Sequence, residues 1–143
     1  MGRGAPLVLV HGIGGRGTVW APLLPALAAG FEVVTVDLPG HGGRAAPDGT
    51  PATVEGYAGR LASFFAELGL GRPHVAGVST GGGIALELAR RGAAASAVAI
   101  SPVGFWTPRE RTYVRRSLEA TRALARRPAV LRAVGSAAVR SSA

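Results

Sequence analysis

Four short, mainly apolar runs occur in the first hundred residues. Each is followed by a segment with a different pattern of hydrophobic and polar positions. The runs cover residues 7–10, 31–36, 74–78 and 97–100. Residues 7–10 form a continuous apolar run, which is typical of a strand that is covered on both faces. Strands alternating with helices predict an α/β fold, a parallel doubly wound sheet of about four strands with flanking helices and right-handed crossovers.

Three helices are predicted between these strands. A short one covers residues 20–29, with prolines near its start. The second is capped by Thr50 or Thr53 and ended by Gly69 and Gly71. The third follows the strand at 74–78, runs to Arg91 and stops at Gly92. The second helix has its apolar positions at the spacing of one helical face: Val54, Tyr57, Leu61, Phe64, Phe65 and Leu68.

The character of the chain changes after Phe105 and Trp106. Thr107 to Glu110 forms a capping box with proline at the first helical position. A helix is predicted to reach Arg127, where Pro128 breaks it, and residues 128–139 are a candidate second helix. Val114, Leu118, Thr121, Leu124 and Ala125 mark one face of the longer helix. We therefore predict a core at residues 1–105 and a separate helical segment at 106–143.

The composition is that of a globular protein. The 143 residues are 48% hydrophobic with a mean hydropathy of +0.28. The sequence contains no run of 18 apolar residues that could span a membrane. The first residues do not resemble a signal peptide, so we expect a cytoplasmic location. Because cysteine is absent, disulfides and thiolate metal sites are excluded.

The formal charge is +8, from sixteen arginines, no lysine and eight acids. Nine arginines fall in residues 105–143, against only Glu110 and Glu119. A basic tail can indicate nucleic acid or an anionic membrane. However, these arginines are spaced as a solvated helix face without interleaved aromatics, and arginine without lysine is typical of a GC-rich genome. We predict no nucleic-acid partner.

The candidate chemistry centres on Ser79, which lies at the junction of the strand at 74–78 and the next helix. Gly77 and Gly81 flank it at two residues on either side, which leaves room for a sharp strand-to-helix turn. Such a turn exposes the Ser79 hydroxyl at the carboxyl end of the sheet, beside a helix N-terminus that favours negative charge. The alternative is a tight turn carrying a solvent-facing serine.

The glycine-rich loop after residues 7–10 allows three interpretations. Gly12, Gly14 and Gly17, with Asp37 twenty residues later, match the dinucleotide-binding fingerprint of NAD-type proteins. The bulky and proline-rich residues that follow argue against the close helix packing which that motif needs. A phosphate-binding P-loop requires lysine, which the chain lacks.

The third interpretation joins the glycine loop to Ser79. If the first strand lies between the second and the third, the loop after it and the Ser79 turn flank the point where strand order reverses. The backbone N–H groups of Ile13 and Thr80 then converge beside the Ser79 hydroxyl. Two such donors stabilise an oxyanion when a carbonyl is attacked.

Three motifs together resemble the α/β-hydrolase family: His11-Gly12 with its glycines, Asp37 to Gly42, and Gly77 to Gly82. Their order and spacing resemble the third, fourth and fifth strands of that family, and the core corresponds to strands three to six. The resemblance implies that Ser79 is a nucleophile, with Ile13 and Thr80 as oxyanion-hole donors. It also implies that the segment from Thr107 begins a helical cap.

The family's catalytic acid and histidine follow later strands that have no counterpart here, so we interpret the chain as the N-terminal part of a serine hydrolase. His11, His41 and His74 are interpreted as structural. We expect an acyl-enzyme on Ser79, a small ester-like substrate, no cofactor and no metal, and little or no activity from these 143 residues alone. An NAD-type binding domain and a non-catalytic remnant remain the alternatives.

Overall fold

A computed structural model describes residues 1–42 and 50–125, and the chain divides into two units after Gly104. The first unit contains a sheet of four parallel strands in the order β2-β1-β3-β4. The predicted parallel sheet is therefore confirmed, and so is the place of the first strand between the second and the third. The strands are β1 (Ala5–Val10), β2 (Phe31–Val36), β3 (His74–Val78) and β4 (Ser96–Ile100).

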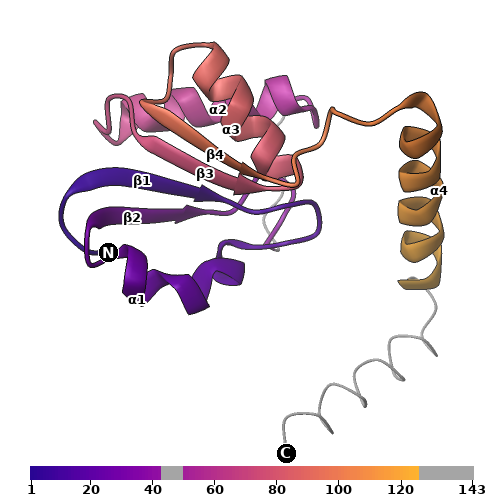
Figure 1. Ribbon diagram of the computed structural model, residues 1–143, viewed down its shortest axis with the longest axis horizontal. Coiled ribbons are helices and arrows are strands. Elements are labelled where there is room, and N and C mark those ends of the chain that lie inside the picture. The colour runs from indigo at the N-terminus through magenta and orange to yellow at the C-terminus, as the bar shows by residue number, and fades with distance from the viewer. Residues whose placement is uncertain (43–49, 126–143) are drawn as a thin grey trace, which may run out of the picture. The chain divides into compact units, whose positions relative to one another are not determined.

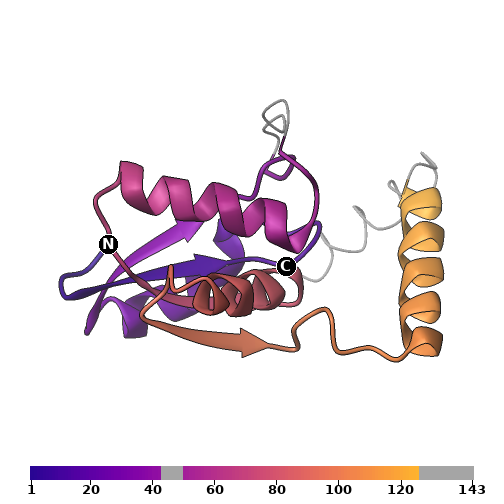
Figure 2. The ribbon, with the colours of Figure 1, turned by 90° about the horizontal axis from the view of Figure 1, so that it is seen from above.

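Helices lie on both faces of this sheet, as expected for a doubly wound fold (Figure 1). Helices α2 (Val54–Glu67) and α3 (Thr80–Arg90) cover one face. The 3₁₀ helix η1 (Gly17–Leu23) and the single turn α1 (Leu24–Leu27) cover the other face. Strand β4 forms one margin of the sheet (Figure 2).

Side-chain alternation along β1 divides the core into two layers. Val8 and Val10 point to the α2–α3 side, where Phe65, Ile84 and Leu88 are also almost completely buried. The opposite side chains of β1 enter a smaller cluster beneath η1 and α1, formed by Leu7, Leu9, Trp20 and Val33. Strand β1 is thus covered on both faces, which explains its continuous apolar sequence.

The segment predicted as one helix at 20–29 is built differently. The chain enters a 3₁₀ helix at Gly17, with Pro22 inside it, and only Leu24–Leu27 are α-helical. Proline has no N–H to donate to an i−4 carbonyl, so this short stretch does not sustain a regular α-helix. The prediction was therefore wrong in both the start and the type of this helix.

The boundaries of α2 follow the predicted signals. The Thr53 side chain accepts a hydrogen bond from the Gly56 N–H at 3.0 Å, so Thr53 is the cap and Thr50 is not. Gly69 adopts a φ of 66° immediately after the helix. The predicted apolar face is correct except at Leu68, which is the C-cap residue and is 51% exposed.

The second unit contains α4 (Pro108–Ala125). Its predicted capping box is confirmed, because the Glu110 carboxylate accepts the Thr107 N–H at 2.8 Å and the Thr107 hydroxyl accepts the Glu110 N–H at 3.3 Å. The predicted end of this helix at Arg127 and the candidate helix at 128–139 lie outside the described residues. Within residues 1–42 and 50–125, no helix is both long enough and apolar enough to cross a bilayer.

Candidate active site

Ser79 occupies the junction of β3 and α3 in an unusual backbone conformation. Its φ of 55° and ψ of −117° fall in a region that residues other than glycine rarely adopt. The Ser79 N–H donates to the Ile100 carbonyl at 2.9 Å, and the Ser79 carbonyl accepts the Gly83 and Val103 N–H groups at 3.1 and 3.2 Å. Hydrogen bonds from three directions therefore hold this strained residue in place.

The two flanking glycines give the turn its room. A Cβ atom at Gly77 would collide with the backbone of Gly81, and one at Gly81 would lie 2.6 Å from the His11 carbonyl oxygen. Any side chain at either position would force β3 or β1 away from α3. The glycine spacing around Ser79 thus has a steric cause in this fold.

The position of β1 brings the first glycine loop to Ser79. A Cβ atom built on Gly12 would lie 3.1 Å from the Ser79 Cβ and 3.7 Å from its Oγ. Thr80 is the first residue of α3, so its N–H has no acceptor within that helix. The Ile13 N–H likewise has no acceptor among residues 1–42 and 50–125. Gly12, Ser79 and Thr80 are therefore brought together, and the direction of the two N–H groups stays a prediction.

The buried His11 side chain holds the glycine loop in place through hydrogen bonds. It is fully buried, its Nδ1 lies 2.7 Å from the Gly12 carbonyl oxygen, and its Nε2 accepts the Leu38 N–H at 3.0 Å. These partners place the ring proton on Nδ1, because a carbonyl only accepts. Gly15 donates to the same Gly12 oxygen at 3.0 Å. Since C=O and N–H point in opposite directions across a trans peptide, this anchoring directs the Ile13 N–H away from His11.

None of the chain's three histidines is bonded to the Ser79 hydroxyl in the part of the chain that the structure describes. The Nδ1 of His41 lies 3.2 Å from the Pro39 carbonyl oxygen, and its ring centroid is 5.2 Å from that of His11. The Nδ1 of His74, at the far end of β3, lies 2.8 Å from the Ser96 Oγ. Each of these histidines is thus bonded to another part of the chain, and its structural role stays a prediction.

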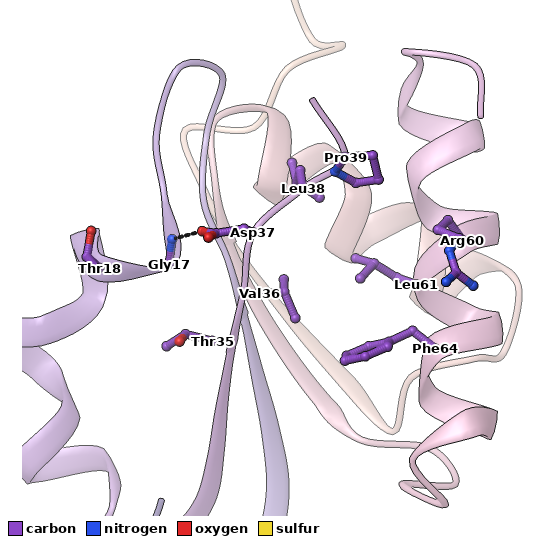
Figure 3. Close-up of a pocket in the computed structure, with 10 residues that line it drawn as sticks. All are labelled: Gly17, Thr18, Thr35, Val36, Asp37, Leu38, Pro39, Arg60, Leu61 and Phe64. Carbon is purple, nitrogen blue, oxygen red and sulfur yellow. Dashed lines mark hydrogen bonds between the residues drawn. The ribbon is translucent and has the colours of Figure 1, made fainter. Parts of the chain in front are cut away.

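Asp37 is engaged within the chain. Its Oδ1 accepts the Gly17 N–H at 2.6 Å (Figure 3). A dinucleotide site would need Asp37 for the ribose. Here Asp37 instead binds the glycine loop to the end of β2. Over residues 1–42 and 50–125, no group of three or more histidine or acidic side chains is placed to hold a metal ion.

A pocket of about 760 Å³ lies beside the free edge of β2. Figure 3 shows it between η1 on one side and α2 on the other. Ser79, Ile13 and Thr80 are not among the residues that line it. The pocket therefore belongs to the margin of the sheet and not to the serine site. Its lining consists of Gly17, Thr18, Thr35, Val36, Asp37, Leu38, Pro39, Arg60, Leu61 and Phe64.

Sequence reasoning missed the turn that supports the serine from the β4 side. Ser101 follows β4 with a φ of 45°, and Val103 then donates to the Ser79 carbonyl. A Cβ at Gly82 would lie 3.2 Å from Pro102, so this turn also packs against the start of α3. Pro102, two residues after the end of β4, was the available signal. Proline marks a turn but does not show what the turn contacts.

A parallel sheet with a strained serine at a strand-to-helix turn, close to a glycine loop, is the arrangement of the α/β-hydrolase class of proteins. The sequence profile described as "Alpha/beta hydrolase family" matches residues 7–142. The chain belongs to this family.

Two curated relatives illustrate the similarity. The chain is 42% identical over 107 residues to a dihydrolipoyllysine-residue acetyltransferase component of the acetoin cleaving system of Cupriavidus necator, a match that covers 73% of this chain and 28% of the relative. It is 38% identical over 88 residues to the pimeloyl-[acyl-carrier protein] methyl ester esterase of Aeromonas hydrophila, covering 62% of this chain and 33% of the esterase. The chain thus spans about a third or less of the length of both relatives.

A solved structure supports the same fold. The crystal structure of a mutant of the N-acyl homoserine lactonase AidH, complexed with N-hexanoyl homoserine, matches with a TM-score of 0.64 and 32% sequence identity. The match covers 71% of this chain and 38% of the lactonase chain. The described core therefore has the arrangement of one part of a larger hydrolase.

Proposed function

We propose that this chain supplies the nucleophile and the oxyanion hole of a serine hydrolase that cleaves a carboxylic ester or a related acyl bond. The observation that carries the proposal is the strained conformation of Ser79 beside Gly12. The esterase and the lactonase named above act on acyl–oxygen bonds by their names, which favours an ester or a lactone as the substrate. An acyl-carrier thioester or an amide would need the same two functional groups.

In the proposed reaction the Ser79 Oγ attacks the substrate carbonyl carbon, and its proton passes to a general base. The N–H groups of Ile13 and Thr80 stabilise the oxyanion that forms. When the tetrahedral intermediate collapses, the bond to the leaving oxygen breaks and that oxygen takes the proton. Water then releases the acyl group as an acid and restores the serine hydroxyl.

The general base is proposed to lie outside these 143 residues. All three histidines of the chain are bonded elsewhere, and a serine hydroxyl without a base is a weak nucleophile near neutral pH. We also propose that the second unit begins the helical cap segment of the complete enzyme and that the protein functions in the cytoplasm. Substrate choice would then depend on that segment and on the walls of the complete pocket.

A fluorophosphonate probe tests the proposal in the complete enzyme, that is, this chain together with the remaining hydrolase segment. The probe is expected to label Ser79, and the Ser79→Ala variant to lose the label. Ser63→Ala is the matched control, because Ser63 lies on an exposed part of α2 and bonds only to its own helix. Labelling that persists in Ser79→Ala would refute the assignment of the nucleophile.

The 143-residue chain alone gives a second prediction. We expect it to hydrolyse a p-nitrophenyl ester no faster than its own Ser79→Ala variant, because no base is present to activate the serine. The measurement is the release of p-nitrophenol by the two proteins at equal concentration. Turnover that depends on Ser79 would show that a base lies within this chain.

A further inference from the structure

The positive charge of this protein is concentrated in the second unit. Residues 105–143 contain nine arginines and two glutamates, and so account for +7 of the formal charge of +8. The first 104 residues are nearly neutral. In the part that the structure describes, five arginines lie on α4, and none of them forms an ion pair with a carboxylate of the described residues. Such asymmetry favours an anionic partner for this unit.

The same unit exposes large apolar side chains. Phe105 is 75% exposed and Trp106 is 39% exposed, immediately before α4. On the helix, Tyr113, Leu118 and Leu124 are 73%, 46% and 50% exposed. Isolated exposed apolar residues need no explanation, but three aromatic residues and two leucines within twenty positions form a concentrated group.

Helical geometry separates these two kinds of side chain on α4. At 3.6 residues per turn, Tyr113, Val114, Leu118, Ala120 and Leu124 share one broad side, which we call the apolar face of α4. Two rows of arginines border this face, with Arg111, Arg115 and Arg122 on one margin and Arg109 and Arg116 on the other. Glu110, Ser117 and Thr121 also lie on this side. The Glu110 carboxylate is bonded to Thr107 at the start of the helix, and the Thr121 hydroxyl donates to the Ser117 carbonyl at 2.8 Å.

We propose that Phe105 and the apolar face of α4 bind the surface of an anionic phospholipid bilayer. An interfacial helix buries its apolar face at the boundary of headgroups and acyl chains, while arginines on its margins reach up to the phosphates. Trp and Tyr prefer that same depth. A nucleic acid would pair with the arginines but would leave the apolar face in water, so a bilayer satisfies more of the observed surface.

The proposal does not depend on hydrolase activity, and its test uses the 143-residue chain. The substitution Trp20→Phe leaves Trp106 as the only tryptophan, because the chain contains two. We expect the Trp106 fluorescence to shift to shorter wavelength with vesicles of phosphatidylcholine containing about 30% phosphatidylglycerol, and not with phosphatidylcholine alone. Raising the salt from about 0.05 to about 0.5 M is expected to weaken the binding.

Matched variants separate the contributions of charge and apolar surface. Each arginine near an anionic surface contributes about fivefold to binding, so Arg115→Gln with Arg122→Gln should weaken binding by an order of magnitude or more. Arg3→Gln with Arg16→Gln removes the same charge from exposed sites of the first unit and should leave binding unchanged. Leu118→Ser should also weaken binding, whereas Leu23→Ser, at a similarly exposed position of η1, should not.

Three results would overturn the proposal. The first is no binding to anionic vesicles. The second is binding that responds to the Arg3 and Arg16 control as strongly as to the α4 variants. The third is binding of a single-stranded or double-stranded oligonucleotide, lost in the α4 arginine variant, without any vesicle binding, which would assign the unit to nucleic acid instead.

Discussion

The conformation of Ser79 is costly for a residue with a side chain, and its neighbours determine that it persists. Sparsely populated backbone conformations cost on the order of 1–3 kcal/mol. Here the Ile100 carbonyl accepts the Ser79 N–H, and the Ser79 carbonyl accepts the N–H groups of Gly83 in α3 and Val103 after β4, so α3 and the end of β4 both oppose relaxation. The turn therefore keeps the Ser79 side chain beside Gly12, where the proposed oxyanion hole begins.

The Ile13 N–H can be removed without removing the rest of the loop. Ile13→Pro deletes this donor, and Gly12 before it tolerates the backbone restriction that proline imposes. In the complete enzyme we expect kcat to fall by about 10²–10³ while KM changes little. Ile13→Ala, which keeps the N–H, is the control and should retain most of the activity. Equal losses in the two variants would show that the side chain matters and the donor does not.

His11 gives a prediction about stability. His11→Phe keeps a ring in the core but leaves the Leu38 N–H without its acceptor and removes one donor to the Gly12 carbonyl. A buried polar group left unsatisfied costs about 1–3 kcal/mol, so the free energy of unfolding should fall by that amount in urea titrations. His74→Phe, which loses only a hydrogen bond near the surface, should have a much smaller effect.

At the scale of elements, an arginine–glutamate cluster joins the end of α3 to the start of α2. Glu87 binds the Nε atoms of both Arg90 and Arg91 at 2.7 Å. Arg91 also donates to the Glu55 carbonyl of α2 at 3.1 Å. The two helices that cover the same face of the sheet are therefore linked at their ends as well as through the core.

This cluster predicts a pH dependence of stability. Hydrogen bonds from Arg90 and then Arg91 lower the pKa of Glu87 from 4.5 to about 2. The folded state thus favours the ionised carboxylate, and its stabilisation is complete above about pH 4.5 and is lost as the pH falls towards 2. Urea unfolding of wild type and Glu87→Gln should show a difference in unfolding free energy that shrinks over this range. A difference that stays constant between pH 2 and pH 7 would contradict this assignment.

At the scale of the whole molecule, the two margins of the sheet are unequal. Helices overhang β2 on both faces, whereas on β4 Val98 is 57% exposed and Ile100 is 46% exposed. An edge strand with exposed apolar side chains is a template for pairing with another chain. The sheet is therefore most open to association along β4.

We expect the isolated chain to self-associate through this edge. Val98→Lys places a charge on the exposed face of β4 and should reduce light scattering and increase the monomer fraction in gel filtration. Val19→Lys is the matched control, because Val19 is 56% exposed on η1 and does not lie on a sheet edge. Improvement by both substitutions would indicate that added charge, and not the blocked edge, reduces association. A wild-type chain that is monodisperse and melts cooperatively would refute the expectation.

Local features of the fold were readable from the sequence. Short, mainly apolar runs located all four strands, and Thr53, Gly69 and the Thr107–Glu110 capping box marked helix ends. These signals are local because a cap or a buried run acts through residues only a few positions away. The 3₁₀ helix at Gly17–Leu23 escaped prediction, because the proline pattern indicates a disturbed helix but does not define its geometry.

The proximity of Gly12 to Ser79 was determined by the tertiary structure. It requires β1 to lie between β2 and β3, and strand order depends on pairings between residues more than sixty positions apart, such as Leu7 with His74. The sequence therefore determined the chemical groups and the short turns that carry them. Only the packing of the sheet determined which of these groups lie side by side, because that choice depends on the burial of whole faces and not on any local preference.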